Sequence, residues 1–130
     1  MKDIKELLQE KCDVISGAPA QQVEIDCFEE KLELTFAKEY KRYLQEFGFV
    51  CVEGHELTGA CTAKRLNVVV VTQAERSHNE FVPNDWYVIE QANVDGIVIW
   101  QSKNGTIYQT QPNTKPIKIC DSLYEYIKQF

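Results

Sequence analysis

The segment that most constrains the fold is residues 35–48, which can form one complete amphipathic helix. Aromatic and leucine side chains recur on one face at helical spacing, while charged and amide side chains occupy the other face. The apolar positions are Phe36, Tyr40, Tyr43, Leu44 and Phe47. Thr35 can cap the first turn, and Gly48 can adopt the left-handed conformation that ends a helix. Such a stripe must be buried, so the chain needs a second layer for this helix to pack against.

Length and composition predict one soluble domain. The chain has 130 residues, of which 44% are hydrophobic and 26% are charged, as in ordinary globular proteins. No apolar run approaches the ~20 residues that span a bilayer, and the charged first dozen residues lack the apolar stretch of a secretory signal. We therefore expect a single domain over residues 1–130, located in the cytoplasm.

The acidic residues are unevenly distributed, and the formal net charge is −6. Residues 1–34 carry 9 acidic against 4 basic side chains, and residues 67–100 carry 5 against 1. An acidic surface repels the phosphate backbone of nucleic acids and attracts basic protein partners. Solubility alone is the plainer interpretation, because moderate acidity is common in cytosolic domains.

The cysteines give no sign of a disulfide framework or a catalytic site. They are Cys12, Cys27, Cys51, Cys61 and Cys120. An odd set without a C-x-x-C pair favours reduced thiols. Cys51, His55 and Cys61 lie close in sequence, but the C-x3-H-x5-C spacing matches no common zinc pattern and no fourth ligand is evident. A cysteine–histidine nucleophile would need an orienting partner that the sequence does not place. We predict no catalytic residue, metal or cofactor, and keep a small metal- or cysteine-dependent enzyme as a remote alternative.

Apolar spacing predicts further elements in the first half of the chain. Residues 2–10 and 21–32 read as amphipathic helices, separated by a Gly- and Pro-containing break at 16–20. Residues 49–52 and 56–61 read as a strand pair.

The valine run at 68–71 is a more ambiguous signal. Its β-branched residues predict a buried strand. Thr72 and Glu75 form a capping box that would start a short helix through about His78. We therefore expect extended structure that turns into helix.

The strongest β signal is residues 86–110, which predict a three-stranded antiparallel meander. Asp95-Gly96 and Asn104-Gly105 both read as two-residue hairpin turns between apolar runs. Tight turns would place one set of side chains on the core face, namely Tyr87, Ile89, Val98, Trp100 and Ile107. The other face would carry Val88, Glu90, Ile97, Ile99, Gln101 and Tyr108.

The C-terminal segment completes the predicted fold. Residues 117–120 can form a last strand, and Ser122 with Glu125 forms a capping box for a closing helix. The sequence thus predicts an α+β fold, in which an antiparallel, mostly meander sheet packs with N-terminal helices, a central helix and a C-terminal helix.

The order of these pieces resembles the SUKH superfamily, the Smi/Knr-like domain, from about residue 20 to the C-terminus. The matching motifs are the aromatic helix at 36–48, T-x-x-x-R at 72–76, YVIE at 87–90, the D-G turn at 95–96, G-x-I-Y at 105–108 and I-C-D-S-L-x-x-Y at 119–126. Family members usually open the main helix with Leu-Pro, whereas this chain has Phe36-Ala37. Proline is favoured but dispensable in a first turn.

The resemblance implies a protein-interaction module. In bacteria such domains commonly serve as immunity proteins, which bind and neutralise the toxin domain of a secreted polymorphic or contact-dependent toxin, often a nuclease. Some eukaryotic members act as intracellular regulatory scaffolds. The leading hypothesis is a non-enzymatic immunity protein whose partner is a toxin domain with a basic surface, and not nucleic acid or a membrane. The alternative is an interaction or scaffold domain without a toxin partner.

The predicted partner-binding surface combines acidic side chains with the second face of the meander. Acidic groups would steer a basic partner, and an aromatic and aliphatic centre would hold it. The predicted residues are Asp85, Trp86, Glu90, Asp95, Ile97, Ile99, Gln101 and Tyr108. Two alternatives stay open, namely that Trp86 is a core residue and that helices cover this face as well.

Overall fold

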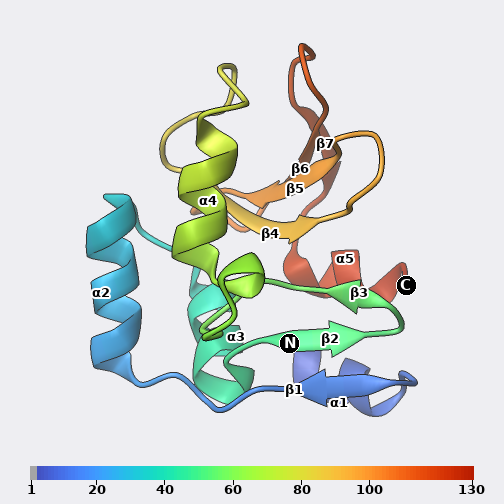
Figure 1. Ribbon diagram of the computed structural model, residues 1–130. Helices are drawn as coiled ribbons and strands as arrows, with labels where there is room; N and C mark the ends of the chain where they lie inside the picture. The colour runs from blue at the N-terminus through green and yellow to red at the C-terminus, as the bar shows by residue number, and fades with distance from the viewer. Residues whose placement is uncertain (1–2) are drawn as a thin grey trace.

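The computed structural model describes residues 3–130 and confirms the predicted α+β class (Figure 1). Helices flank two antiparallel sheets, ordered β1-β2-β3 and β4-β5-β6-β7. The helices are α1 (Ile4–Gln9), α2 (Gln22–Leu32), α3 (Lys38–Phe47), α4 (Val68–Arg76) and α5 (Leu123–Lys128), with a 3₁₀ turn at Lys64–Leu66. The strands are β1 (Val14–Ser16), β2 (Val50–Val52), β3 (His55–Glu56), β4 (Tyr87–Gln91), β5 (Val98–Gln101), β6 (Ile107–Thr110) and β7 (Ile117–Cys120).

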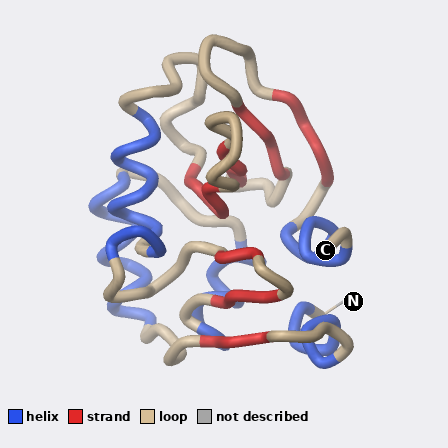
Figure 2. Tube along the Cα trace, turned by 45° about the vertical axis from the view of Figure 1, so that its right-hand side comes forward, coloured by secondary structure: helices blue, strands red, loops and turns tan. Residues whose placement is uncertain are grey.

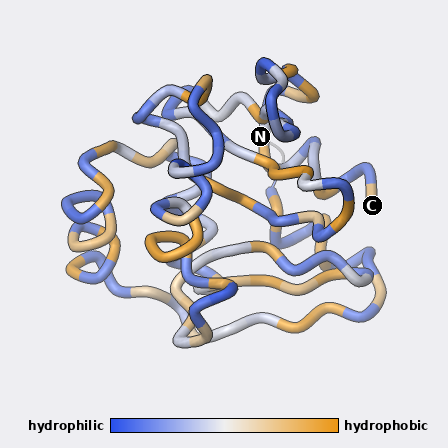
Figure 3. The backbone as a smooth tube through the Cα atoms, turned by 45° about the horizontal axis from the view of Figure 1, so that its top comes forward, coloured by the Kyte–Doolittle hydropathy of each residue, from blue (hydrophilic) through white to orange (hydrophobic). Residues whose placement is uncertain are grey.

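The two sheets form separate groups of strands, and the helices that carry the chain ends, α1 and α5, lie beside each other (Figure 2). Lys11 Nζ donates a hydrogen bond to the Phe130 carbonyl oxygen at 2.9 Å, which ties the region after α1 to the C-terminus. The helices predicted at 2–10 and 21–32 form as α1 and α2, although Lys2 lies outside the described residues. Hydrophilic and hydrophobic residues alternate along α2 (left in Figure 3), as expected for an amphipathic helix.

The predicted aromatic helix forms as α3, but the prediction that Thr35 caps it is wrong. Ala37 occupies the cap position, and its side chain accepts no hydrogen bond from the first turn. Side chains from other elements instead accept bonds from the two residues before the helix: the Phe36 N–H donates to Glu29 Oε2 at 2.8 Å, and the Ala37 N–H donates to Tyr87 Oη at 3.0 Å. Tertiary contacts therefore fix the backbone that leads into α3.

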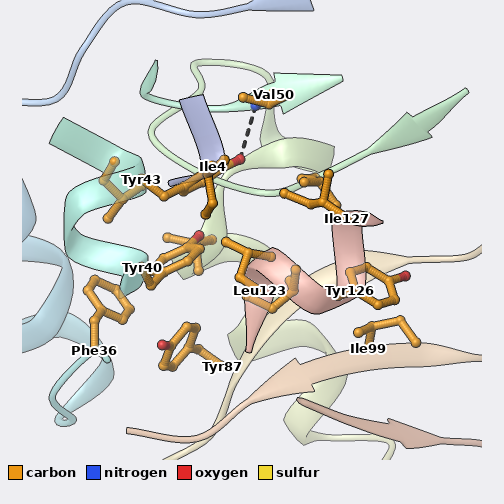
Figure 4. Packing of buried hydrophobic residues seen from close by; sticks show 14 of the residues in the cluster. Ile4, Phe36, Tyr40, Tyr43, Val50, Tyr87, Ile99, Leu123, Tyr126 and Ile127 are labelled. Atoms are coloured by element: carbon orange, nitrogen blue, oxygen red, sulfur yellow. Dashed lines mark hydrogen bonds between the residues drawn. The ribbon is translucent and has the colours of Figure 1, made fainter. Parts of the chain in front are cut away.

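The other end of α3 matches the prediction. Gly48 follows the helix with φ of 73°, and a Cβ atom there would lie 2.0 Å from the Ala18 carbonyl oxygen. Glycine is thus required by both backbone conformation and space. The stripe of Tyr40, Tyr43 and Leu44 is buried in the main core (Figure 4).

The first sheet contains the predicted strand pair, β2 and β3, and one strand that the sequence did not predict. β1 pairs antiparallel with β2 and places Ile15 opposite Cys51. The sequence predicts only a Gly- and Pro-containing break at 16–20, directly after this strand. A strand of three residues has too little alternation to be recognised from sequence.

The valine run is helical from its first residue, so the predicted strand at 68–71 is wrong. Asn67 precedes α4, and its Oδ1 accepts hydrogen bonds from the backbone N–H groups of Val69 at 3.0 Å and Val70 at 3.2 Å. Val68 and Val71 are buried under the helix. Capping and burial outweigh the weak β preference of valine, which is worth only a fraction of a kilocalorie per residue.

The second sheet contains the predicted meander and the predicted last strand, but one of its turns differs. The Ser102 N–H donates to the Thr106 carbonyl oxygen at 3.0 Å, so the loop at 103–105 has one residue more than the predicted turn. Trp100 consequently lies opposite Tyr108. A register shift of one residue exchanges the two faces of a strand. Trp100 therefore does not lie on the main-core face, where the sequence predicted it.

The β4–β5 pairing also departs from the predicted register. The connection is longer than a two-residue turn, and a bulge shifts the register between Val88 and Glu90. Tyr87 lies opposite Gln101, and Glu90 lies opposite Ile99. Because of the bulge, Tyr87 and Glu90, which are three residues apart, lie on the same face of β4. Glu90, Ile99 and Gln101 therefore share the inner face of the sheet with Tyr87.

Each face of the second sheet has its own apolar cluster. The main core includes Tyr87, Ile89, Ile99 and Ile107 and continues into α3, α5 and the first sheet. A second cluster on the other face contains Val71, Trp86, Val88, Val98 and Trp100. Because Val71 belongs to α4, a helix covers this face, as one of the two alternatives proposed. Within residues 3–130, no helix is long and apolar enough to cross a membrane.

Candidate partner-binding site

Besides Trp86, three of the predicted partner-binding residues are buried inside the protein. The exposed fractions are 5% for Glu90, 3% for Ile99 and 0% for Gln101. The register shifts in the meander turn these side chains toward the main core. The prediction that they form a surface patch is therefore wrong for the folded protein.

The buried Glu90 holds the two sheets and α5 together. His55 Nδ1 lies 3.0 Å from Glu90 Oε2, and the Tyr126 hydroxyl donates a hydrogen bond to Glu90 Oε1. The His55 ring stacks on Phe130, with 3.7 Å between the ring centroids. The imidazole of His55 thus pairs with the Glu90 carboxylate and stacks on the Phe130 ring. Within residues 3–130, no three His, Cys, Asp or Glu side chains are grouped so that they could hold a metal ion.

Gln101 also has a structural role. Its Nε2 donates to Glu39 Oε1 at 3.1 Å, and its Oε1 accepts a hydrogen bond from the Tyr87 hydroxyl at 2.8 Å. Glu39 in turn accepts hydrogen bonds from the backbone N–H groups of Leu123 at 2.7 Å and Tyr124 at 3.0 Å. A side chain of α3 therefore caps the N-terminus of α5.

Trp86 and Tyr108 form a stacked pair over the second cluster. Their ring centroids are 4.0 Å apart and the ring planes differ by 14°. Trp86 is 9% exposed, so of the two alternatives for this residue the structure favours core packing. Tyr108 is half-buried beside it.

The remaining predicted residues are on the surface. Asp85 and Asp95 are exposed, and Ile97 is half-buried. Asp85 lies near the guanidinium of Arg76, whereas Asp95 precedes Gly96 at a cleft that Ile97 lines. Asp95 and Ile97 therefore both lie at the end of the molecule that carries this cleft.

That end contains a surface groove, which we call the distal groove. It consists of two clefts of ≈ 390 Å³ and ≈ 280 Å³ that share His78 and Asn79 in their linings. The larger cleft is also lined by Glu75, Gln91, Asn93, Ile97, Val98 and Pro112. The smaller cleft adds Glu80, Phe81, Val82, Thr110, Gln111 and Thr114. The groove thus lies between the end of α4, the loop that follows it, and the β4–β5 and β6–β7 loops; two of these loops project at the top of Figure 1.

Amide side chains position an acidic group in the larger cleft. Gln91 Nε2 donates to Glu75 Oε2 at 2.5 Å. Asn79 Nδ2 donates to the Glu75 carbonyl oxygen at 2.7 Å and lies 3.5 Å from Glu75 Oε1. The Glu75 carboxylate is therefore oriented by neighbours from the loop after α4 and from β4.

Close backbone packing forms one wall of this cleft. Gly96 has φ of +70°, and a Cβ atom there would lie 2.8 Å from Pro112 Cδ. The β4–β5 and β6–β7 loops can approach this closely only because residue 96 lacks a side chain.

The groove is acidic because Glu75 and Glu80 line it, whereas no lysine or arginine of residues 3–130 does. The one basic residue of segment 67–100 makes its contacts elsewhere. Arg76 donates to the carbonyl oxygens of Asn84 at 2.5 Å and Leu32 at 3.4 Å, and burial lowers its pKa. Thr72 Oγ1 accepts a hydrogen bond from the Val88 N–H at 3.0 Å. The T-x-x-x-R motif therefore fixes α4 against β4 and the preceding loop.

The sequence could have indicated part of this groove. Glu75, His78 and Asn79 have i, i+3, i+4 spacing, which places them on one face if the predicted short helix is extended by a turn. Gln91 and Pro112 come from distant segments, and no sequence pattern links them to α4.

A third cleft, of ≈ 180 Å³, lies outside the distal groove, between α1 and α3. Its Arg42 already pairs with Asp3 at 3.4 Å and with Glu46 at 2.7 Å. Because these charges neutralise one another, this cleft offers less electrostatic attraction to a partner than the distal groove.

Comparison with known proteins identifies the family. The fold is that of a small α+β domain with a surface groove. The sequence matches the family SUKH_5, described as SMI1-KNR4 cell-wall, over residues 1–130, so the chain belongs to the SUKH family. No curated protein matches the chain significantly.

Proposed function

We propose that this protein is a cytoplasmic, non-enzymatic immunity protein that neutralises a toxin domain by binding it through the distal groove. Domains of the SUKH family often serve as immunity proteins, and this chain belongs to that family. The observation that carries the choice of surface is the acidic groove itself. Glu75 lines the groove with a carboxylate that Gln91 holds in place, and Asp95 adjoins the groove.

The composition of the groove fits a protein partner with a basic surface. Phe81 in the smaller cleft is 48% exposed, and Val94 in the β4–β5 loop is 52% exposed. Apolar side chains beside acidic and amide groups are typical of interface centres. Acidic groups increase the rate of encounter with a basic partner, and the apolar contacts slow dissociation.

The environment of the thiols supports a non-enzymatic role. Burial raises the pKa of Cys51, and burial also raises the pKa of Cys120. A raised pKa keeps a thiol protonated at neutral pH, whereas a nucleophilic cysteine needs a lowered one.

Co-purification tests this proposal. The protein is mixed with the purified C-terminal domain of the toxin encoded beside its gene, and the mixture is examined by size-exclusion chromatography and in the toxin's activity assay. We expect a stoichiometric complex and loss of toxin activity. Separate elution together with an active toxin would contradict the proposal and favour a scaffold role.

Charge reversal tests the surface. Glu75→Lys lies in the distal groove, and the matched control Glu6→Lys lies on an exposed position of α1. We expect Glu75→Lys to weaken the complex and Glu6→Lys to leave it intact. Equal effects of the two variants would show that another surface binds the toxin.

A further inference from the structure

We infer that the larger cleft of the distal groove is an arginine pocket, in which the Glu75 carboxylate receives the guanidinium of an arginine side chain presented by the partner protein. This inference rests on the proposed function for its biological partner, but the pocket can be tested without a toxin. Its volume of ≈ 390 Å³ lies within the range of clefts that bind small ligands.

The hydrogen bonds already made by Glu75 leave room for a further ligand. Its Oε2 accepts one bond from Gln91 at 2.5 Å, and Asn79 Nδ2 lies 3.5 Å from its Oε1. An ionised carboxylate has about four acceptor sites, so about two remain for a ligand. Among residues 3–130, no lysine or arginine lines the cleft, and the imidazole of His78 is its one basic group.

The neighbouring amides favour a guanidinium over an ammonium group. Gln91 and Asn79 use their NH₂ groups toward Glu75, which leaves their carbonyl oxygens as acceptors. Asn93 also lines the cleft and adds another amide. A guanidinium has five N–H donors in a fixed planar arrangement, which suits several acceptors around one carboxylate better than a compact ammonium does.

Apolar groups in the same cleft provide a surface for the aliphatic part of the side chain. Ile97, Val98 and Pro112 line it together with Glu75. An arginine stem packs along apolar surface while its head reaches a polar partner. The close contact between Gly96 and Pro112 fixes this wall before binding, so little ordering is needed when the ligand enters.

A titration with a small probe tests the pocket directly. N-acetyl-arginine amide is added to the ¹⁵N-labelled protein, and the side-chain amide signals of Gln91, Asn79 and Asn93 are followed by NMR. N-acetyl-citrulline amide, which has a similar shape and no charge, is the matched probe. We expect saturable shifts of these signals with the arginine probe and at least ~10-fold weaker binding of the citrulline probe, as expected for loss of a charged hydrogen bond. Equal binding of the two probes, or no shifts, would overturn the inference.

Two variants locate the effect. Glu75→Gln keeps the size of the side chain and removes its charge, and we expect at least ~10-fold weaker binding of the arginine probe. Glu6→Gln makes the same change at an exposed position of α1, outside the distal groove, and we expect binding to be unchanged. Both variants are checked for retained fold by their amide spectra. Wild-type affinity in a folded Glu75→Gln protein would contradict the pocket.

The two proposals fail separately. If the arginine probe binds at Glu75 but the toxin domain does not co-elute, the pocket stands and the immunity function falls. If the toxin co-elutes with wild-type and Glu75→Gln proteins equally well, the immunity function stands and the pocket is not its anchor.

Discussion

The main core and the distal groove use polar side chains in opposite ways. In the core, the Tyr43 hydroxyl donates to the Thr58 carbonyl oxygen at 2.7 Å. It also accepts from the Val50 N–H at 3.0 Å (Figure 4), so its hydrogen-bonding groups are used inside the protein. In the groove, Glu75 is oriented by amides but keeps acceptor sites that face an open cleft. The first arrangement stabilises the fold, and the second positions a group for a partner.

This difference indicates how the domain separates stability from recognition. Helices and paired strands satisfy each other's polar groups, whereas the groove is built largely from loops and a helix end, which tolerate sequence change. A domain built in this way can therefore vary the groove without disturbing the core.

Alkaline pH should destabilise the protein through its core tyrosines. Burial is the main cause that raises the pKa of Tyr40, Tyr43, Tyr87 and Tyr126 above the usual tyrosine value. Because the folded-state pKa is raised, the stability is fully present below about pH 10, the pKa in the unfolded chain, and is lost as pH rises above it. Each tyrosine contributes about 1.4 kcal/mol per pH unit, or about 5.5 kcal/mol per pH unit for the four. Urea denaturation between pH 9 and 12 measures this slope, and a flat profile would contradict it.

Leu44→Ala should cost about 2–5 kcal/mol of unfolding free energy, because Leu44 is fully buried under α3. Phe81→Ala in the groove is the comparison, and its cost should stay within about 0.5 kcal/mol. Chemical denaturation of both variants gives the two values. Similar losses would show that the groove also contributes to the core.

Tyr43→Phe should cost about 1–3 kcal/mol, because it leaves the Thr58 carbonyl and the Val50 N–H without their buried partner. The shape of the side chain is kept, so the loss reports the hydrogen bonds and not a cavity. The variant should also lower the alkaline slope by about a quarter, which the same urea series at high pH can measure. An unchanged slope would exclude Tyr43 as a source of the alkaline effect.

The meander and α4 show how far the sequence predicts this fold. Element order and most element types followed from apolar spacing and caps, including the closing helix, where Ser122 Oγ accepts from the Glu125 N–H at 3.0 Å. The faces of β4 and β5 did not, because they depend on one extra loop residue and one bulge. Such local choices leave almost no trace in hydrophobic periodicity, yet each changes which side chains are buried.

The site was harder to predict than the fold for a related reason. Glu90 and Gln101 are polar and were expected at the surface, but His55, Tyr126 and Glu39 satisfy them inside. Buried polar residues are recognised only when their partners are known, and those partners lie far away in sequence. The groove depends on contacts between loops, which a single sequence does not specify.

Asn67→Ala should cost about 1 kcal/mol, because its side chain caps the valine-rich start of α4. The loss should appear as lower protection of the first α4 amides in hydrogen exchange, while α3 amides change less. Equal loss of protection in both helices would mean that α4 does not open separately from the core. An unaffected α4 would contradict the role of the cap.

Glu75→Gln should have the smallest effect on stability, within about 0.5 kcal/mol, because its carboxylate faces the cleft. Thermal denaturation beside wild type measures the difference. A loss as large as that of Tyr43→Phe would mean that Glu75 belongs to the structural polar network, and the contrast between core and groove would then fail.

The most direct test of the central claim is the dissociation constant of the toxin complex, measured by calorimetry for wild type, Glu75→Lys and Glu6→Lys at low and high salt. The account predicts that Glu75→Lys raises the constant at least ~10-fold and that wild-type binding weakens with salt, while Glu6→Lys binds like wild type. Wild-type affinity for Glu75→Lys would contradict it.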